Sequence, residues 1–323
     1  MRRRHFIAGL GSLSLAFVGP GFAQTRQRLV AWLGIGSAEG PSPYVDALRT
    51  GLRERGWVEG RNLALSIYWA RGREDMDDVA RRLLATNPEV IVTQELMVYA
   101  VQPLQPKMPV VFGFSGDPVQ GNLVDGLARP GRNFTGMSYL ASALVGKRIE
   151  ILKEWLPKVQ RVAILAQPQH PGEQLERQAS EEAAAKLGLT LSYHPVSGMA
   201  AVDDALESIR QDRCDALVVF PDSTMYRESE RIARFAIEAR LPSVSGWAPF
   251  ATSGLLLTYG PNIRDLYRSL ARYVDSILRG TSAADLPVEL PSKFELVINA
   301  KTAKALGIAI PPSLLARADE VIE

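Results

Sequence analysis

The sequence predicts an α/β protein built from two doubly wound lobes. Short apolar runs alternate with amphipathic segments of helical length through most of the chain, a pattern typical of parallel sheets covered by helices on both faces. Several runs are apolar without alternation, among them VAILA at 162–166 and ALVVF at 216–220. Such runs are expected for strands that are buried on both faces.

The predicted strands form two sets with a similar order of elements, one over residues 28–139 and one over 160–257. A chain of this length exceeds what a single core usually supports, which favours two lobes. The runs expected to form strands are Leu29–Ile35, Leu63–Trp69, Val90–Thr93, Val110–Phe114, Phe134–Tyr139, Val162–Ala166, Leu189–Val196, Ala216–Phe220, Pro242–Trp247, Leu255–Tyr259 and Phe294–Asn299.

The segment from Asn262 to Leu278 is the clearest predicted helix. Its apolar residues recur at helical spacing, Asn262 can cap the first turn, and Gly280 follows the end. We expect its tyrosines and leucines to pack in a core rather than to hold a cofactor. The later stretch LPVELP, residues 286–291, predicts an extended crossing between the lobes because prolines disfavour helix before and within it.

Residues 1–23 resemble an export signal. Arg2–Arg4 precede a short, mildly apolar run over Phe6–Val18, and Gly21-Phe22-Ala23 offers small residues where a signal peptidase cleaves. The paired arginines before His-Phe-Ile also fit a twin-arginine signal. The apolar run is shorter than the roughly 20 residues that span a bilayer. We therefore expect a periplasmic protein that begins near Gln24.

Composition excludes some function classes. Without residues 1–23 the formal net charge changes from +2 to −1, because that segment holds three arginines and no acidic residue or lysine. A nearly neutral chain lacks the basic footprint of a general nucleic-acid binder. The single cysteine, Cys214, excludes an intramolecular disulfide. Its position just before an apolar run predicts a buried thiol rather than a nucleophile.

Candidate site residues lie at the junctions between strands and helices, because ligands of open α/β sheets bind beyond the carboxyl ends of the strands. Helix N-termini there offer free N–H groups and a positive dipole end. The candidates are Ser37, Gln94, Glu95, Ser115, Asp117, Gln167, Asp222 and Trp247. Asp117 and Asp222 either pair with a ligand ammonium group or cap helices, a common role for aspartate. Trp247 either stacks on a flat ligand or belongs to the hinge or core.

The sequence lacks the common catalytic and cofactor-binding motifs. The sequence has no G-x-S-x-G elbow and no P-loop lysine motif, and Gly34-Ile35-Gly36 lacks the third glycine of a dinucleotide fingerprint. His170 and His194 have no partner at metal-ligand spacing, so no metal site is supported. We expect a binding protein without a cofactor, with an exported α/β enzyme as an alternative.

Four segments are similar to a known family. They are Gly51–Asn62, Gly116–Ser138, Gly146–Pro157 and Asp285–Glu323. On these segments the chain resembles the ABC transporter substrate-binding proteins of the tryptophan/tyrosine type. The resemblance implies a type I periplasmic-binding-protein fold, in which two lobes joined by a hinge close around a ligand.

The resemblance also implies how the chain is divided and what it meets. Lobe 1 would comprise residues 24–139 with about 260–285, and lobe 2 residues 140–259 with about 286–323. The expected partners are a small-molecule ligand and an ABC transporter permease in the inner membrane, with no nucleic acid. The expected oligomeric state is a monomer.

The chain departs from the family after the third predicted strand. Relatives often carry a small Gly/Thr-Pro-Ala sequence there, whereas this chain has Thr93-Gln94-Glu95-Leu96-Met97. Gln94 and Glu95 are expected to reshape the pocket mouth, and Glu95 to add negative charge. This fits a cationic or hydrogen-bond-rich ligand at least as well as an aromatic amino acid.

These observations together predict the solute-binding component of an importer, which captures a small polar ligand such as an amino acid or a related compound. A sensor that presents its ligand to a membrane receptor remains an alternative. A sugar-responsive DNA-binding repressor shares the fold, but the export signal and the lack of a helix-turn-helix head argue against it.

Overall fold

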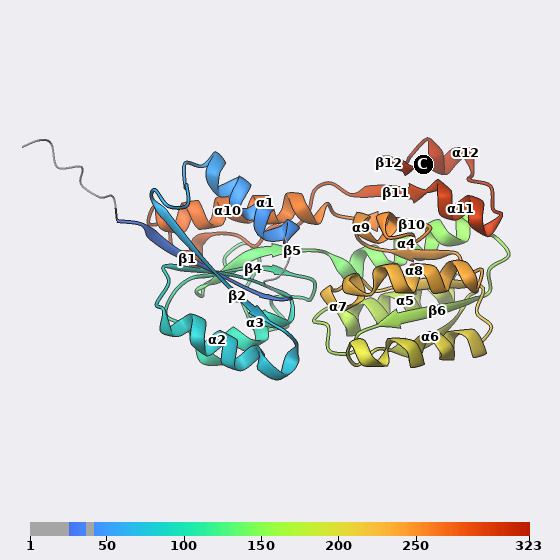
Figure 1. Ribbon diagram of the computed structural model, residues 1–323, viewed down its shortest axis with the longest axis horizontal. Helices are drawn as coiled ribbons and strands as arrows, with labels where there is room; N and C mark the ends of the chain where they lie inside the picture. Colours follow the sequence, from blue (N-terminus) through green and yellow to red (C-terminus); the bar gives the residue numbers. More distant parts are fainter. Residues whose placement is uncertain (1–25, 37–41) are drawn as a thin grey trace, which may run out of the picture.

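The computed structural model describes residues 26–36 and 42–323 (Figure 1). The predicted export signal over residues 1–23 and the candidate Ser37 lie outside these ranges. The described chain forms two sheets that lie side by side along the long axis of the molecule, each with helices against it (Figure 1).

The first sheet is entirely parallel, with strand order β2-β1-β3-β4-β5. Its strands are β1 (Arg28–Ile35), β2 (Leu63–Ala70), β3 (Val90–Gln94), β4 (Val110–Phe114) and β5 (Phe134–Ser138). Its helices are α1 (Pro43–Glu54), α2 (Met76–Ala85), α3 (Leu96–Val101) and, from far along the chain, α10 (Ile263–Leu278).

Alternate residues of β1 enter different cores on the two faces of this sheet. Val30 and Trp32 pack in one apolar cluster with Leu48 of α1 and with α10. Ala31 and Leu33 pack in another cluster, with α2 and α3. Because successive side chains of a strand point to opposite faces, the continuous apolar run is explained by burial on both sides.

The second sheet has strand order β12-β11-β10-β9-β8-β6-β7, and only the pair β10 and β11 is antiparallel. Its strands are β6 (Arg161–Ala166), β7 (Thr190–Pro195), β8 (Ala216–Val219), β9 (Ser243–Ser245), β10 (Leu257–Gly260), β11 (Glu295–Asn299) and β12 (Glu320–Ile322). Its helices are α4 (Ala141–Trp155), α5 (Glu173–Leu187), α6 (Val202–Gln211), α7 (Ser223–Arg227), α8 (Ser229–Glu238), α9 (Ala248–Thr252), α11 (Ala300–Leu306) and α12 (Pro312–Leu315).

The doubly wound α/β prediction is confirmed, and each predicted apolar run overlaps a strand. The predicted helix after Asn262 is also confirmed: Asn262 accepts a hydrogen bond from the Asp265 N–H at 3.0 Å, and Tyr267 and Tyr273 are buried. Cys214 is free and buried, as expected. β12 was not predicted from the sequence; it has only three residues, none of them fully buried.

The chain passes between the two sheets more than once. It leaves the first sheet after β5, returns after β10 to form α10, and crosses again to β11 (Figure 1). The predicted crossing at 286–291 is extended, and the Ser138 N–H donates to the Glu289 carbonyl at 2.9 Å. These connections bring the carboxyl ends of β1, β2 and β3 and the segment after β8 around one cavity.

Candidate functional site

A cavity of about 230 Å³ lies where the two lobes face each other. It receives residues from the end of β1, the start of α1, the ends of β2 and β3, and the short helix α7 of the second lobe. The described residues that line it are Ile35, Gly36, Ser42, Pro43, Tyr44, Trp69, Gln94, Ser223, Tyr226 and Arg227. A larger hollow of about 660 Å³ shares Tyr44 and Tyr226 with it.

Three aromatic side chains form much of the cavity wall: Tyr44 and Trp69 from the first lobe and Tyr226 from the second. The Tyr44 and Tyr226 rings are 6.5 Å apart between centroids. Trp69 packs against bare backbone, because a Cβ built on Gly34 would lie 2.6 Å from Trp69 Cζ3. Glycine at this position therefore makes room for the indole.

A chain of hydroxyl groups supports Gln94 at the cavity floor. Tyr139 OH donates to Tyr267 OH at 2.6 Å, and Tyr267 OH donates in turn to Gln94 Oε1. The Tyr44 hydroxyl is buried without a partner among the described residues, and burial raises its pKa. Buried polar atoms are normally paired, so this hydroxyl is available to a bound molecule. Arg227, which is exposed, places a cation at the rim.

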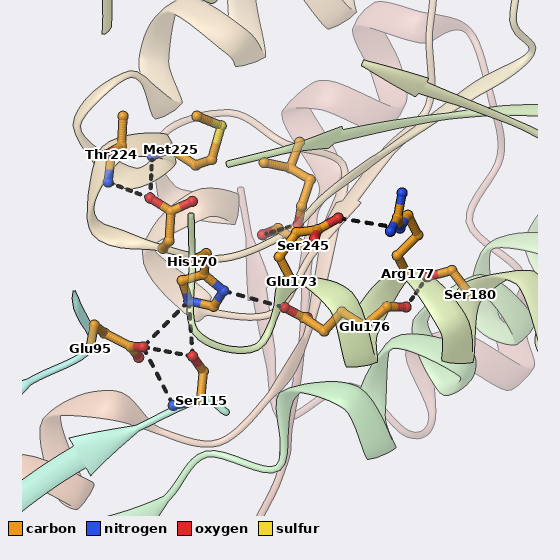
Figure 2. Close-up of polar contacts among 12 residues, drawn as sticks. Glu95, Ser115, His170, Glu173, Glu176, Arg177, Ser180, Thr224, Met225 and Ser245 are labelled. Carbon is orange, nitrogen blue, oxygen red and sulfur yellow. Dashed lines mark hydrogen bonds and ion pairs between the residues drawn. The ribbon is translucent and has the colours of Figure 1, made fainter. Parts of the chain in front are cut away.

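Beside this cavity a polar bridge joins the lobes (Figure 2). Ser115, just after β4, donates from Oγ to Glu95 Oε2 at 2.6 Å. His170, from the loop between β6 and α5 of the second lobe, has Nε2 at 2.9 Å from Ser115 Oγ and 3.4 Å from Glu95 Oε2. All three side chains are buried. Glu95 Oε2 is thus engaged across the cleft, while Oε1 is buried without a partner among the described residues. Glu95 is not among the residues that line the cavity.

A buried ion pair lies behind His170. Arg148 of α4 places Nη1 3.2 Å from Glu176 Oε1 of α5, and Glu176 Oε2 is 3.8 Å from His170 Nδ1. Burial raises the pKa of Glu176 to about 7, although Arg148 and His170 favour its charged form. Burial alone would lower the pKa of His170, but Glu95, Asp222 and Glu176 raise it to about 9. The carboxylates around His170 therefore favour its imidazolium form at neutral pH.

Ser115, His170 and Glu176 have the order of a hydrolytic triad, with the serine near one ring nitrogen and the acid near the other. Their chemistry differs from that of a triad. A general base must be neutral to accept the serine proton, whereas His170 is protonated at neutral pH. The Ser115 hydroxyl already donates to Glu95. We therefore interpret Glu95, Ser115 and His170 as a contact between the two lobes, not as a nucleophile with its general base.

Asp222 caps α7 and keeps one oxygen free. Its Oδ1 accepts hydrogen bonds from the Thr224 and Met225 N–H groups, the latter at 3.1 Å (Figure 2). Its Oδ2 is buried with no partner among the described residues. Burial raises the pKa of this carboxyl, while His170 and the two N–H groups favour the charged form. Both roles left open by the sequence are compatible with this geometry.

The remaining candidate residues lie elsewhere. Asp117 Oδ1 caps the following turn, accepting from the Val119 N–H at 2.8 Å, and lines a second cavity of about 200 Å³ together with Ser115. Gln167 is half-buried, and its carbonyl accepts from the His170 N–H. Trp247 is buried in the core, with its ring 6.4 Å from that of Tyr139. Of the candidates that the structure describes, only Gln94 lines the aromatic cavity. Glu95, Ser115 and Asp222 gather around His170, and Asp117, Gln167 and Trp247 lie outside the aromatic cavity.

Several residues of the site had not been singled out from the sequence. They are Tyr44, Trp69, Tyr226, Arg227, Arg148, Glu176 and, as a lobe contact, His170. The pair Gly34 and Gly36 was the available signal for a close approach, since both lie beside Trp69. Among residues 26–36 and 42–323 there is no group of three His, Cys, Asp or Glu placed to hold a metal. In the same residues no helix is both long and apolar enough to span a membrane.

Comparisons with known proteins agree with this architecture. A tyrosine-binding protein of Clostridioides difficile (strain R20291) is 23% identical over 274 residues, which cover 82% of this chain and 78% of that protein. A conserved domain protein of Vibrio cholerae has a solved structure with a TM-score of 0.85 and 29% identity, covering 92% of this chain and all of that chain.

A further solved structure shares the type I periplasmic-binding-protein fold. It is the ABC domain from Streptococcus pneumonia in complex with L-Trp, with a TM-score of 0.84 and 22% identity, covering 92% of this chain and all of that chain. The family model of ABC transporter substrate binding proteins matches residues 35–322, and this is a family of binding proteins, not of enzymes. The chain belongs to the ABC transporter substrate-binding protein family.

Proposed function

We propose that this protein captures an aromatic amino acid, tyrosine or tryptophan, for an ABC importer. The observation that carries the proposal is the aromatic cavity built by Tyr44, Trp69 and Tyr226 from both lobes. The relatives named for binding tyrosine or L-Trp support the same ligand class. The charge of Glu95, which had argued against an aromatic ligand, is taken up by Ser115 and His170.

The cavity suits an amino acid in size and polarity. Its volume of about 230 Å³ is below the roughly 300–1,000 Å³ of sites for drug-sized ligands. In our proposal the ligand ring packs against Trp69 and the two tyrosines. Its carboxylate faces Arg227, since planar guanidinium groups match carboxylates well. Its ammonium group lies toward Asp222, which directly precedes the lining residue Ser223 and keeps a buried oxygen without a partner among the described residues.

We propose that capture proceeds by closure of two lobes, residues 24–139 with about 260–285 and residues 140–259 with about 286–323. The repeated crossings between the sheets support a hinge there. A ligand that touches both lobes binds the closed state better than the open one, and this difference limits how far it can shift the equilibrium.

We further propose that the mature protein acts in the periplasm as a monomer and delivers its ligand to a permease in the inner membrane. The basic and apolar pattern of residues 1–23 supports export. Family membership supports the partnership with a permease.

Thermal denaturation of residues 24–323, freed of ligand by unfolding and refolding, tests the ligand class. Tryptophan, tyrosine and phenylalanine are compared with leucine, arginine and glutamate. A ligand at 100 times its Kd adds about 2.7 kcal/mol to stability. We expect a shift with aromatic amino acids, and its loss in Trp69→Ala and Tyr226→Ala. Tyr99→Ala, at an exposed tyrosine outside the cavity, is the matched control. A shift with arginine alone would contradict the proposal.

A further inference from the structure

Glu95 and His170 face each other across the cleft, one from each lobe, and both are almost fully buried. The His170 side chain is 2% exposed and that of Glu95 is 7% exposed. Ser115 lies between them and contacts both (Figure 2). When the lobes separate, this contact must break, because its two halves belong to different sheets.

The surroundings of His170 are strongly acidic. Glu95 faces it from the first lobe, Glu176 of α5 lies at its other ring nitrogen, and Asp222 acts on it from the loop before α7. Arg148 of α4 brings a cation to this cluster, and it is paired with Glu176. A protonated His170 therefore offsets part of the buried negative charge.

The backbone at Glu95 is further evidence that this contact is specific. Glu95 has φ 46° and ψ −127° at the bend between β3 and α3. A positive φ is uncommon for residues with a long side chain, and such strain persists where the surroundings require that conformation. Here the strained bend directs the carboxylate to Ser115 and His170.

On the basis of the closure proposed above, we propose that closing of the cleft takes up one proton at His170, so that ligand capture is coupled to pH. In the open state the ring loses Glu95 and gains water. In the closed state the imidazolium is held between Glu95 and Glu176. Protonation thus favours the closed state, and ligand affinity decreases as the pH rises.

The change of ligand affinity with pH follows from the linkage between proton binding and closure. The ordinary pKa of histidine is 6.5, and in the closed structure, although burial opposes the charge, the carboxylates raise the His170 pKa to about 9. A group whose pKa is higher in the closed state stabilises that state. The stabilisation is complete when the pH lies below the pKa of the open state. It is lost as the pH rises through the pKa of the closed state. Glu176 and Asp222 stay beside His170 when the lobes separate, so the change in its pKa comes from the loss of Glu95 and from solvent. Affinity should therefore fall as the pH rises toward 9, by less than tenfold per pH unit.

Isothermal titration calorimetry of the mature protein with tryptophan and with tyrosine tests this coupling. Titrations at pH 6.5, 7.5 and 8.5, in buffers with different ionisation enthalpies, give both the Kd and the number of protons taken up. We expect net proton uptake on binding between pH 7.5 and 8.5, and weaker binding at pH 8.5. Both effects should be largely lost in His170→Gln and in Glu95→Gln. His194→Gln, which alters the other histidine of the mature chain, should keep them.

The proposal is overturned if the wild-type protein takes up no proton, or if His170→Gln takes up as many as the wild type. Titration of the ligand amino group is shared by all variants and cancels in these comparisons. If no aromatic amino acid binds, the proposed function fails. Small-angle scattering of the ligand-free protein then tests whether closure is coupled to protonation of His170. A radius of gyration that is smaller at pH 6 than at pH 9, in wild type but not in His170→Gln, supports the coupling. An unchanged radius in both overturns it.

Discussion

Arg148 Nη1 lies 3.2 Å from Glu176 Oε1, and the two side chains are 1% and 0% exposed. The Arg148 Nε–H donates to the Tyr259 carbonyl at 2.9 Å. The pair thus ties α4 to α5 and to the end of β10 behind His170. A buried ion pair adds little beyond a well-packed apolar pair, but removing one partner leaves an uncompensated charge.

Arg148→Met should therefore destabilise the protein by about 3–5 kcal/mol at pH 8. The loss should be smaller at pH 5, because burial raises the Glu176 pKa and the remaining carboxyl can then be neutral. Urea denaturation at the two pH values measures this. Lys147→Met, at the exposed neighbouring pair with Glu150, should change stability by less than about 0.5 kcal/mol. An equal loss in both variants would show that burial of the pair is not the cause.

Gly34→Ala should weaken binding of aromatic ligands. An added Cβ would lie 2.6 Å from Trp69 Cζ3 and 2.9 Å from Trp32 Nε1, so the indole of the cavity wall must move. Such overpacking costs about 1–3 kcal/mol. Ligand titration and thermal denaturation of the variant measure both effects. Gly146→Ala, whose Cβ would meet only the Ala183 Cβ at 3.6 Å, should bind normally. Unchanged affinity in Gly34→Ala would mean that Trp69 does not contact the ligand.

The strands were predictable because strands buried on both faces have continuous apolar sequences. The cavity was not, because it depends on which strands pair and in which register. Trp69 faces Gly34 because β2 pairs with β1 in a register that sets the two residues side by side. Neither run reveals this pairing alone. Tyr226 and Arg227 were missed because α7 has only five residues, too few for a periodic pattern.

The contact of Glu95 and Ser115 with His170 could not be predicted from the sequence. The sequence showed Glu95 as a departure from relatives. The orientation of its side chain, however, depends on a backbone with φ 46° and on His170 of the other lobe. His170 has no neighbour in the sequence that signals a role. It becomes informative only when the second lobe brings it to 2.9 Å from Ser115.

Replacement of Arg3 and Arg4 by lysine tests the export route. If the signal is of the twin-arginine type, the double variant should stay in the cytoplasm as a precursor, because that pathway requires the arginine pair. Cell fractionation and immunoblotting would measure this. Arg2→Lys, which leaves the pair intact, should be exported normally. Normal export of the double variant would instead indicate the general secretory route.

Asp222 offers a way to separate capping from ligand binding. Asparagine caps helices about as well as aspartate, so Asp222→Asn should keep the hydrogen bonds to the Thr224 and Met225 N–H groups. It should also remove a buried carboxyl whose pKa is raised by burial. At pH 7 the variant should be about as stable as the wild type, because the lost attraction to His170 offsets the removed cost of burying an ionised group.

The same change removes the negative charge that we assign to the ligand ammonium group. Charge-assisted hydrogen bonds contribute about 1.5–3 kcal/mol, so the affinity of Asp222→Asn for tyrosine should fall by roughly 10- to 100-fold. Asp222→Ala should lose the cap as well, and with it about 1 kcal/mol of stability. Paired measurements of urea unfolding and ligand affinity distinguish the roles. If Asp222→Asn binds normally and only Asp222→Ala is impaired, Asp222 serves α7 alone and the ammonium group must bind elsewhere in the cavity.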